Sequence, residues 1–200
     1  MTLQNRVFPT GEIVARPFRG EWMGNRGILH DDQRRLGAAR WRHKNWICCA
    51  LEFRGRHRQV MRPRNYTELF FLDDATALAV GHRPCAECRN ADYRRFKAVW
   101  EECFGPAFAT EIDRALHLAR VGRDRRQLRH RGQARDLPDG AMFVTDRVWL
   151  VWAGQAHEWH EQGYGSPTAL PAADVQVLTP APMVRVLAAG YHPQPHVSLA

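Results

Sequence analysis

The chain has 200 residues, a formal net charge of +8 and 44% hydrophobic residues. This length allows one ordinary domain or two small ones with a core that needs no disulfides, and the apolar content excludes a wholly disordered protein. The chain has no run of 18 apolar residues, and residues 1–16 lack the apolar segment of a secretory signal, so we expect a cytoplasmic protein that does not span a membrane.

In chain order, residues 1–30 predict loops and short strands, because they are rich in glycine, proline and arginine. Residues 31–43 predict a short helix with acidic residues in its first turn. The apolar run over residues 46–53 predicts a buried strand, and residues 59–61 are expected to form a partner strand. A second apolar run follows over residues 66–72.

The middle of the chain predicts helices. Asp73 and Gly81 are typical of the two ends of a helix over residues 74–80. Residues 90–103 predict the next helix, in which the helical spacing of apolar residues places Cys103 in the core.

The C-terminal third is expected to be rich in strands. Residues 110–113 resemble a capping box before a third helix, and the basic stretch beyond it predicts either a helical extension or a mobile arm. His157 and His160 are expected in a solvated loop. On either side of these histidines, β-branched and aromatic residues predict strands over 141–145, 147–152 and 174–178, and a short helix is expected over 180–189.

The five cysteines point to a metal site. An odd number in a cytoplasmic chain argues against a disulfide framework. Cys85 and Cys88 form a Cys-x-x-Cys pair at a turn that leads into a helix, and this spacing suits tetrahedral zinc. The helix N-terminus, together with Arg83 and Arg89, is expected to lower the cysteine pKa values. A structural zinc ion needs two further ligands.

The sequence FFLDDATALAVGHRPCAECR, residues 70–89, resembles the zinc-binding Ada domain of bacterial alkylation-repair proteins. A looser resemblance covers residues 46–90. It implies a zinc ion held by four cysteines, two of them from an upstream Cys-x-x-x-Cys, and a zinc thiolate that accepts a methyl group from a DNA phosphotriester. This chain has the adjacent pair Cys48-Cys49 in place of that upstream motif.

Neighbouring residues on a strand point to opposite faces, so one of Cys48 and Cys49 is expected to face the metal and the other to lie in the core. We favour Cys49 as the ligand, and either thiolate is a candidate nucleophile. His57 is the preferred fourth ligand, with His82, His43 or a water as alternatives.

Two other functions remain open. Residues 84–88, Pro-Cys-Ala-Glu-Cys, match half of the zinc deaminase signature, which favours a zinc hydrolase or deaminase acting on a nucleobase or nucleotide. Three protein ligands and a bound water would then be joined by Glu52, Glu68 or Glu87 as the acid or base. The third interpretation is a structural zinc module for protein interaction.

The net charge is concentrated in residues 114–135, which hold eight arginines and one acid, a charge of +7, and leave +1 for the rest of the chain. Such a segment predicts contacts with nucleic acid phosphates, DNA being favoured. The candidate contact residues are Arg54, Arg56, Arg58, Arg83, Arg89, Arg120, Arg123, Arg125, Arg126, Arg129 and Arg131.

Together these features predict an α+β protein with three parts. Residues 1–105 are expected to form an Ada-like zinc-knuckle module with an N-terminal extension, residues 106–136 a helix and basic arm, and residues 137–200 a β-rich unit. The expected function is zinc-dependent binding of nucleic acid, in DNA repair or an alkylation response.

Overall fold

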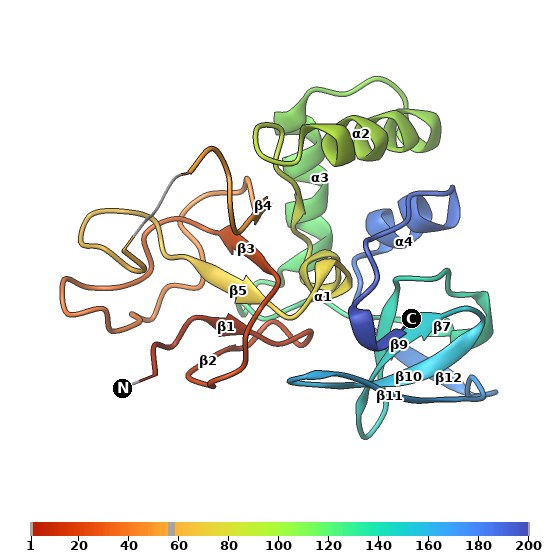
Figure 1. Cartoon of the computed structure of the whole chain (residues 1–200). Helices are drawn as coiled ribbons and strands as arrows, with labels where there is room; N and C mark the ends of the chain where they lie inside the picture. Colours follow the sequence, from red (N-terminus) through yellow and green to blue (C-terminus); the bar gives the residue numbers. More distant parts are fainter. Residues whose placement is uncertain (1, 56–58, 200) are drawn as a thin grey trace.

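The computed structural model describes residues 2–55 and 59–199. Within these ranges the chain forms two six-stranded sheets and four α-helices, which confirms the predicted α+β class (Figure 1). None of the helices described there is long and apolar enough to cross a membrane.

The first sheet belongs to the N-terminal half and has the order β2-β1-β5-β3-β4-β6. The pairs β1/β5 and β4/β6 are parallel, and the other neighbours are antiparallel. Gly24 allows β3 and β4 to approach closely, because a Cβ atom there would lie 2.6 Å from the Ile47 carbonyl oxygen. The strands are β1 (Arg6–Val7), β2 (Ile13–Val14), β3 (Trp22–Asn25), β4 (Ile47–Ala50), β5 (Leu69–Phe71) and β6 (Arg83–Pro84).

The second sheet is antiparallel throughout and has the order β11-β10-β9-β8-β12-β7. Its strands are β7 (His130–Gln133), β8 (Met142–Val144), β9 (Val148–Trp152), β10 (Gln155–His160), β11 (Gly163–Thr168) and β12 (Asp174–Val177). The three strands expected over 141–145, 147–152 and 174–178 correspond to β8, β9 and β12.

The helices are α1 (Asp74–Ala79), α2 (Asn90–Phe104), α3 (Ala109–Arg120) and α4 (Ala181–Ala188). Two short 3₁₀ helices span Ala134–Asp136 and Val197–Leu199. Asp73 caps α1, as predicted, by accepting a 2.8 Å hydrogen bond from the Thr76 backbone N–H. Gly81 follows the helix with a φ of +80°, a conformation that favours glycine.

Helix α1 lies between the two sheets (Figure 1) and contacts β3, β5 and β8. All six of its residues are buried. Ala75 and Ala79 belong to a cluster with Met142 and Leu150 of the second sheet, and Ala77 to a cluster with Leu69 and Phe71 of the first. Helices α2 and α3 pack against α4 through Phe96, Leu116 and Val186. The hydrophobic core therefore joins the N-terminal half of the chain to its C-terminal third.

The helix predicted over residues 31–43 is wrong: this segment forms turns and an isolated bridge between His30 and Leu36. The Asp31 carboxylate accepts hydrogen bonds from the backbone N–H groups of Gln33 and Arg35, each 2.9 Å long, and so stabilises a turn in place of a helix. The predicted strand over 59–61 is also wrong, because these residues form no strand and Met61 lies in a turn with a φ of +53°.

The basic stretch beyond α3 forms neither a helical extension nor an arm. The helix ends at Arg120, a turn closed by a bridge between Val121 and Gln127 follows, and β7 then pairs with β12 at the edge of the second sheet. The solvated loop expected at His157 and His160 is wrong as well, because both residues belong to β10, where His157 is 8% exposed.

Candidate metal centre

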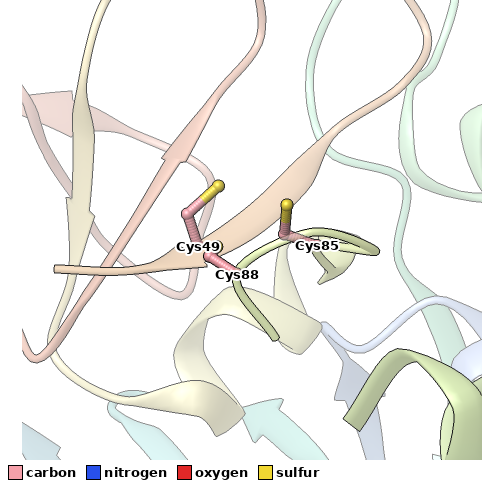
Figure 2. A group of neighbouring side chains, drawn as sticks. All are labelled: Cys49, Cys85 and Cys88. Atoms are coloured by element: carbon pink, nitrogen blue, oxygen red, sulfur yellow. The ribbon is translucent and has the colours of Figure 1, made fainter. Parts of the chain in front are cut away.

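Three cysteines from two separate segments come together beside the first sheet. The sulfur atoms of Cys49, Cys85 and Cys88 all lie within 4.8 Å of one another. Cys49 projects from β4, and the loop between β6 and α2 carries Cys85 and Cys88 (Figure 2). The structure thus brings the predicted Cys-x-x-Cys pair together with Cys49, the upstream cysteine that we favoured.

Backbone pairing between β4 and β6 fixes this arrangement. The two strands run parallel, with Cys48 opposite Pro84, and the Cys85 backbone N–H donates a 2.9 Å hydrogen bond to the Cys48 carbonyl. The loop then turns tightly, since the Arg89 N–H bonds to the Cys85 carbonyl at 3.1 Å. Both cysteines of the loop are therefore held beside Cys49 by hydrogen bonds of the main chain.

Hydrogen bonds to sulfur favour a thiolate at the centre of the cluster. A hydrogen bond with the Cys49 thiol, supported by backbone N–H groups of Cys88 and Glu87, lowers the pKa of Cys85 to about 5. The same hydrogen bond and burial raise the pKa of Cys49, and burial raises that of Cys88. These hydrogen bonds therefore favour the thiolate form of Cys85.

The donor set fits a soft, tetrahedral metal ion. Zinc–sulfur bonds of about 2.3 Å place the sulfurs of a tetrahedral site about 3.8 Å apart, a separation compatible with three sulfurs that all lie within 4.8 Å of one another. Thiolate ligands favour Zn²⁺, Cu⁺ or iron–sulfur clusters over hard ions such as Mg²⁺. Three cysteines leave one position of a tetrahedral site for a fourth ligand.

No histidine or carboxylate in residues 2–55 and 59–199 completes the group of three sulfurs. The expected fourth ligand, His57, lies outside the described residues, as do Arg56 and Arg58. His82 packs against the rings of Trp46 and Phe71, and His43 Nε2 lies 3.1 Å from Asn25 Oδ1, so neither alternative histidine belongs to the cluster.

The carboxylates considered for a hydrolase also lie outside the cluster. Glu52 and Glu87 are exposed, and Glu68 is buried, with its Oε2 accepting a 2.7 Å hydrogen bond from the Met61 N–H. Among the described residues, none of these three carboxylates joins the group formed by Cys49, Cys85 and Cys88.

Cys48 faces away from the cluster and is fully buried. Its sulfur accepts a 3.4 Å hydrogen bond from Arg89 Nη1, and burial raises the pKa of its thiol. Cys49 is half-buried, so of the two candidate nucleophiles only Cys49 combines partial exposure with a place in the cluster. Cys103 is half-buried on α2, its thiol directed to the Arg185 carbonyl at 3.8 Å.

The two arginines that flank the Cys-x-x-Cys pair are internal structural residues. Arg83 forms two 2.8 Å hydrogen bonds to Asp113 on α3, and Arg89 bonds Asp74 of α1 at 2.7 and 2.9 Å. Each arginine is only 5% exposed, so their guanidinium groups are not available for the phosphate contacts that the sequence predicted. Sequence reasoning missed both carboxylate partners, because no local pattern links residues so far apart.

The remaining candidate phosphate contacts are mostly on the surface. Seven of the eight arginines in residues 114–135 are exposed, and only Arg120 is buried. Arg54 is exposed beyond β4, in the chain segment that follows Cys49. Among the described residues, the one ion pair formed by these seven arginines is the 4.0 Å contact of Arg126 with Asp124.

Comparison with known proteins gives no relative: no family model matches the chain, and neither the curated proteins nor the solved structures contain a match. The resemblance to Ada domains therefore stays a prediction that rests on residues 46–90.

Proposed function

We propose that the protein is a zinc-binding protein that binds nucleic acid, with Cys49, Cys85 and Cys88 as zinc ligands. The observation that carries the zinc part is the group of three sulfurs within 4.8 Å of one another, donated by a strand and a loop that the fold holds rigidly together. Structural and thiolate-rich zinc sites use this donor set. A histidine such as His57, or a water, would complete the coordination.

The nucleic acid part is supported by the exposed arginines of residues 114–135. The segment has a net charge of +7, with the buried Arg120 included, and it covers the second half of α3, the following turn and β7. Exposed arginines without carboxylate partners remain free to neutralise phosphates, and each phosphate neutralised releases condensed counterions from the nucleic acid. Binding should therefore weaken steeply as the salt concentration rises.

Metal analysis tests the zinc site. Purified protein is expected to carry about one zinc per chain, and Cys85→Ser should lose it. Cys103→Ser is the matched control, since Cys103 is a half-buried cysteine outside the cluster, and it should keep the metal. A folded protein without a thiophilic metal, or equal zinc in both variants, would contradict the proposal.

A pair of arginine variants tests the nucleic acid part. Arg123→Gln/Arg131→Gln removes two exposed charges from the basic segment, and Arg34→Gln/Arg94→Gln removes two exposed charges elsewhere. The first variant should reduce the slope of log affinity against log salt for duplex DNA by about two, and the second should leave it unchanged. Equal slopes in all three proteins would refute the proposed binding surface.

The partial exposure of Cys49 favours one specific activity, alkyl transfer. Its thiolate, kept ionised by zinc, would attack the methyl carbon of a methyl phosphotriester: the S–CH₃ bond forms, the C–O bond breaks, and the phosphodiester anion leaves. Incubation with methylated DNA should add one methyl group to Cys49, detected by peptide mass spectrometry. Unmodified Cys49 in zinc-loaded protein that binds the same DNA would exclude this activity.

A further inference from the structure

A second candidate site lies on the basic side of the molecule. A cavity of about 620 Å³ is bordered by residues of the N-terminal part and of the turn after α3, and none of the three clustered cysteines lines it. Ligand pockets of proteins are typically about 300–1,000 Å³ in volume, so this one has room for a small molecule. We call it the arginine pocket, because it is lined by Arg26, Arg40, Arg120, Arg125, Arg126 and Arg129.

Two of these arginines are buried. Arg26 is 2% exposed and Arg120 is 1% exposed, and the guanidinium carbon of each lies 4.0 Å from the centroid of the Trp46 ring. Such cation–π contacts stabilise a buried guanidinium only in part. The pair is therefore a strong concentration of positive charge in a region of low polarity.

The hydrogen bonding of the two buried guanidiniums is incomplete. Arg120 donates to the carbonyls of Gly81 and Lys44, both at 2.5 Å, but its Nε has no partner. Arg26 Nε lies 3.5 Å from His82 Nε2, and its Nη2 has no partner. Within the described residues, neither guanidinium forms an ion pair with a carboxylate, whereas Arg83 and Arg89 each have one.

The acids near the pocket do not balance this charge. Glu12 and Asp124 line the cavity, but both are exposed, and Asp124 already accepts the backbone N–H of Arg126 at 3.0 Å. The neighbouring His82 does not add to the positive charge. His82 is fully buried, and burial together with Arg26 and Arg120 keeps its pKa well below its usual range.

The cost of this arrangement is visible in the arginines themselves. Burial, followed by repulsion from Arg40, lowers the pKa of Arg26 to about 9, and burial lowers that of Arg120, with Arg26 adding to the effect. Guanidinium groups nevertheless stay protonated at neutral pH. An anion in the pocket that both residues line would therefore offset this charge and accept the unused N–H groups.

From this geometry we infer that the arginine pocket binds a phosphate group, with the unpartnered N–H groups of Arg26 and Arg120 as donors and the exposed Arg129 at its rim. Hydrogen bonds from a guanidinium to phosphate oxygens are strong because both groups are charged, and each buried guanidinium supplies one unused nitrogen, Arg26 Nη2 and Arg120 Nε. The pocket is larger than one phosphate, so it also accommodates a residue attached to that phosphate. The inference goes beyond the proposed function, since it does not require that the phosphate belong to nucleic acid.

Calorimetric titration and thermal unfolding in chloride buffer test this inference. Inorganic phosphate, a nucleoside 5′-monophosphate and a short DNA strand with or without a 5′-phosphate are the probes. Phosphate or the monophosphate should raise Tm of the wild-type protein, and Arg26→Gln should weaken its affinity about tenfold or more. Arg34→Gln, which removes an exposed arginine outside the pocket, should leave the affinity unchanged.

The exposed Arg129 provides a variant that does not depend on a buried residue. If Arg26→Gln fails to fold, Arg129→Gln should still weaken phosphate binding severalfold more than Arg34→Gln does. No Tm change and no heat of binding with phosphate or monophosphate would overturn the inference, as would equal affinities of the wild type and the pocket variant.

The probes also separate this inference from the proposed function. Phosphate binding that depends on Arg26 or Arg129, without binding of any DNA strand, would support the pocket and refute the nucleic acid function. DNA binding without phosphate binding would do the opposite. A DNA strand that binds more tightly with its 5′-phosphate, and only while the pocket is intact, would identify the phosphate as a strand terminus.

Discussion

The buried ion pair between Arg89 and Asp74 should determine how firmly the cysteine loop is held. Arg89 follows Cys88 directly, and its side chain reaches Asp74 on α1. The side chains of Arg89 and Asp74 are 2% and 1% exposed. The same guanidinium contacts Asp92 at 2.9 Å and lies 3.9 Å from the centroid of the Trp22 ring. One side chain therefore links the loop to α1, α2 and β3.

Arg89→Met would leave the Asp74 carboxylate buried without its cation. Breaking a buried pair from one side typically costs about 3–5 kcal/mol, a large part of the roughly 5–15 kcal/mol that stabilises a whole protein. For a chain of this size, Tm should fall by about 10 °C. The double variant Arg89→Met/Asp74→Leu should recover much of the loss, because it removes both buried charges.

Urea unfolding of the zinc-loaded protein, followed by tryptophan fluorescence and circular dichroism, measures these differences. Arg95→Met is the matched control: it is the same substitution at another arginine that pairs with Asp92, but the Arg95 side chain is 64% exposed, so this pair should contribute about 0–1 kcal/mol. A loss for Arg89→Met no larger than for Arg95→Met would refute the reasoning.

Three further predictions follow from the same structure. A zinc chelator should lower Tm of the wild-type protein and release about one metal ion per chain, and an unchanged Tm would mean that the three sulfurs do not share a stabilising metal. Burial, followed by repulsion from Arg120 and Lys44, lowers the pKa of His117 to about 4 in the folded protein, whereas its ordinary value is 6.5. The neutral imidazole therefore contributes to stability above pH 6.5, and this contribution is lost as pH falls towards 4. His117→Gln should flatten the dependence of the free energy of unfolding, measured with urea, on pH between 4 and 6.5. An unaltered dependence would show that His117 does not contribute to it. Gly24→Ala should destabilise the protein by about 1–3 kcal/mol, because the alanine Cβ would lie 2.6 Å from the Ile47 carbonyl oxygen. If the variant unfolds at the same urea concentration as the wild type, β3 and β4 can move apart without a cost in stability.

The part of the fold around the cysteine loop could be predicted from the sequence because its signals are local. Asp73 and Gly81 mark the ends of α1, and the Cys-x-x-Cys spacing marks the loop that follows. Strand alternation then separates the upstream cysteines, with Cys48 fully buried and Cys49 directed to the cluster. Each step depends on residues only a few positions apart.

Other elements depend on contacts that no local pattern contains. Residues 31–43 have acidic residues at the position of a helix start, yet Asp31 uses its carboxylate to close a turn. The strand β10 looks polar in sequence, but it pairs with β9 and β11, and Trp159 packs against Phe8 and Phe18 from the distant N-terminal segment. The ion pair of Arg83 with Asp113 depends on how α3 packs beside β6, which the sequence does not encode locally.

Charge counted along the sequence identified the basic segment, with Arg120 in it, but it did not identify Arg26 or show that folding buries Arg120 beside it. The exposed arginines of residues 114–135 are solvated and cost little free energy to keep, so they can bind phosphates but do not need an anion for stability. Arg26 and Arg120 come from distant segments, and folding buries both beside Trp46 with N–H groups unused. Because burying an unpaired charge is costly, the buried pair is a stronger argument for an anionic ligand than the larger number of exposed arginines.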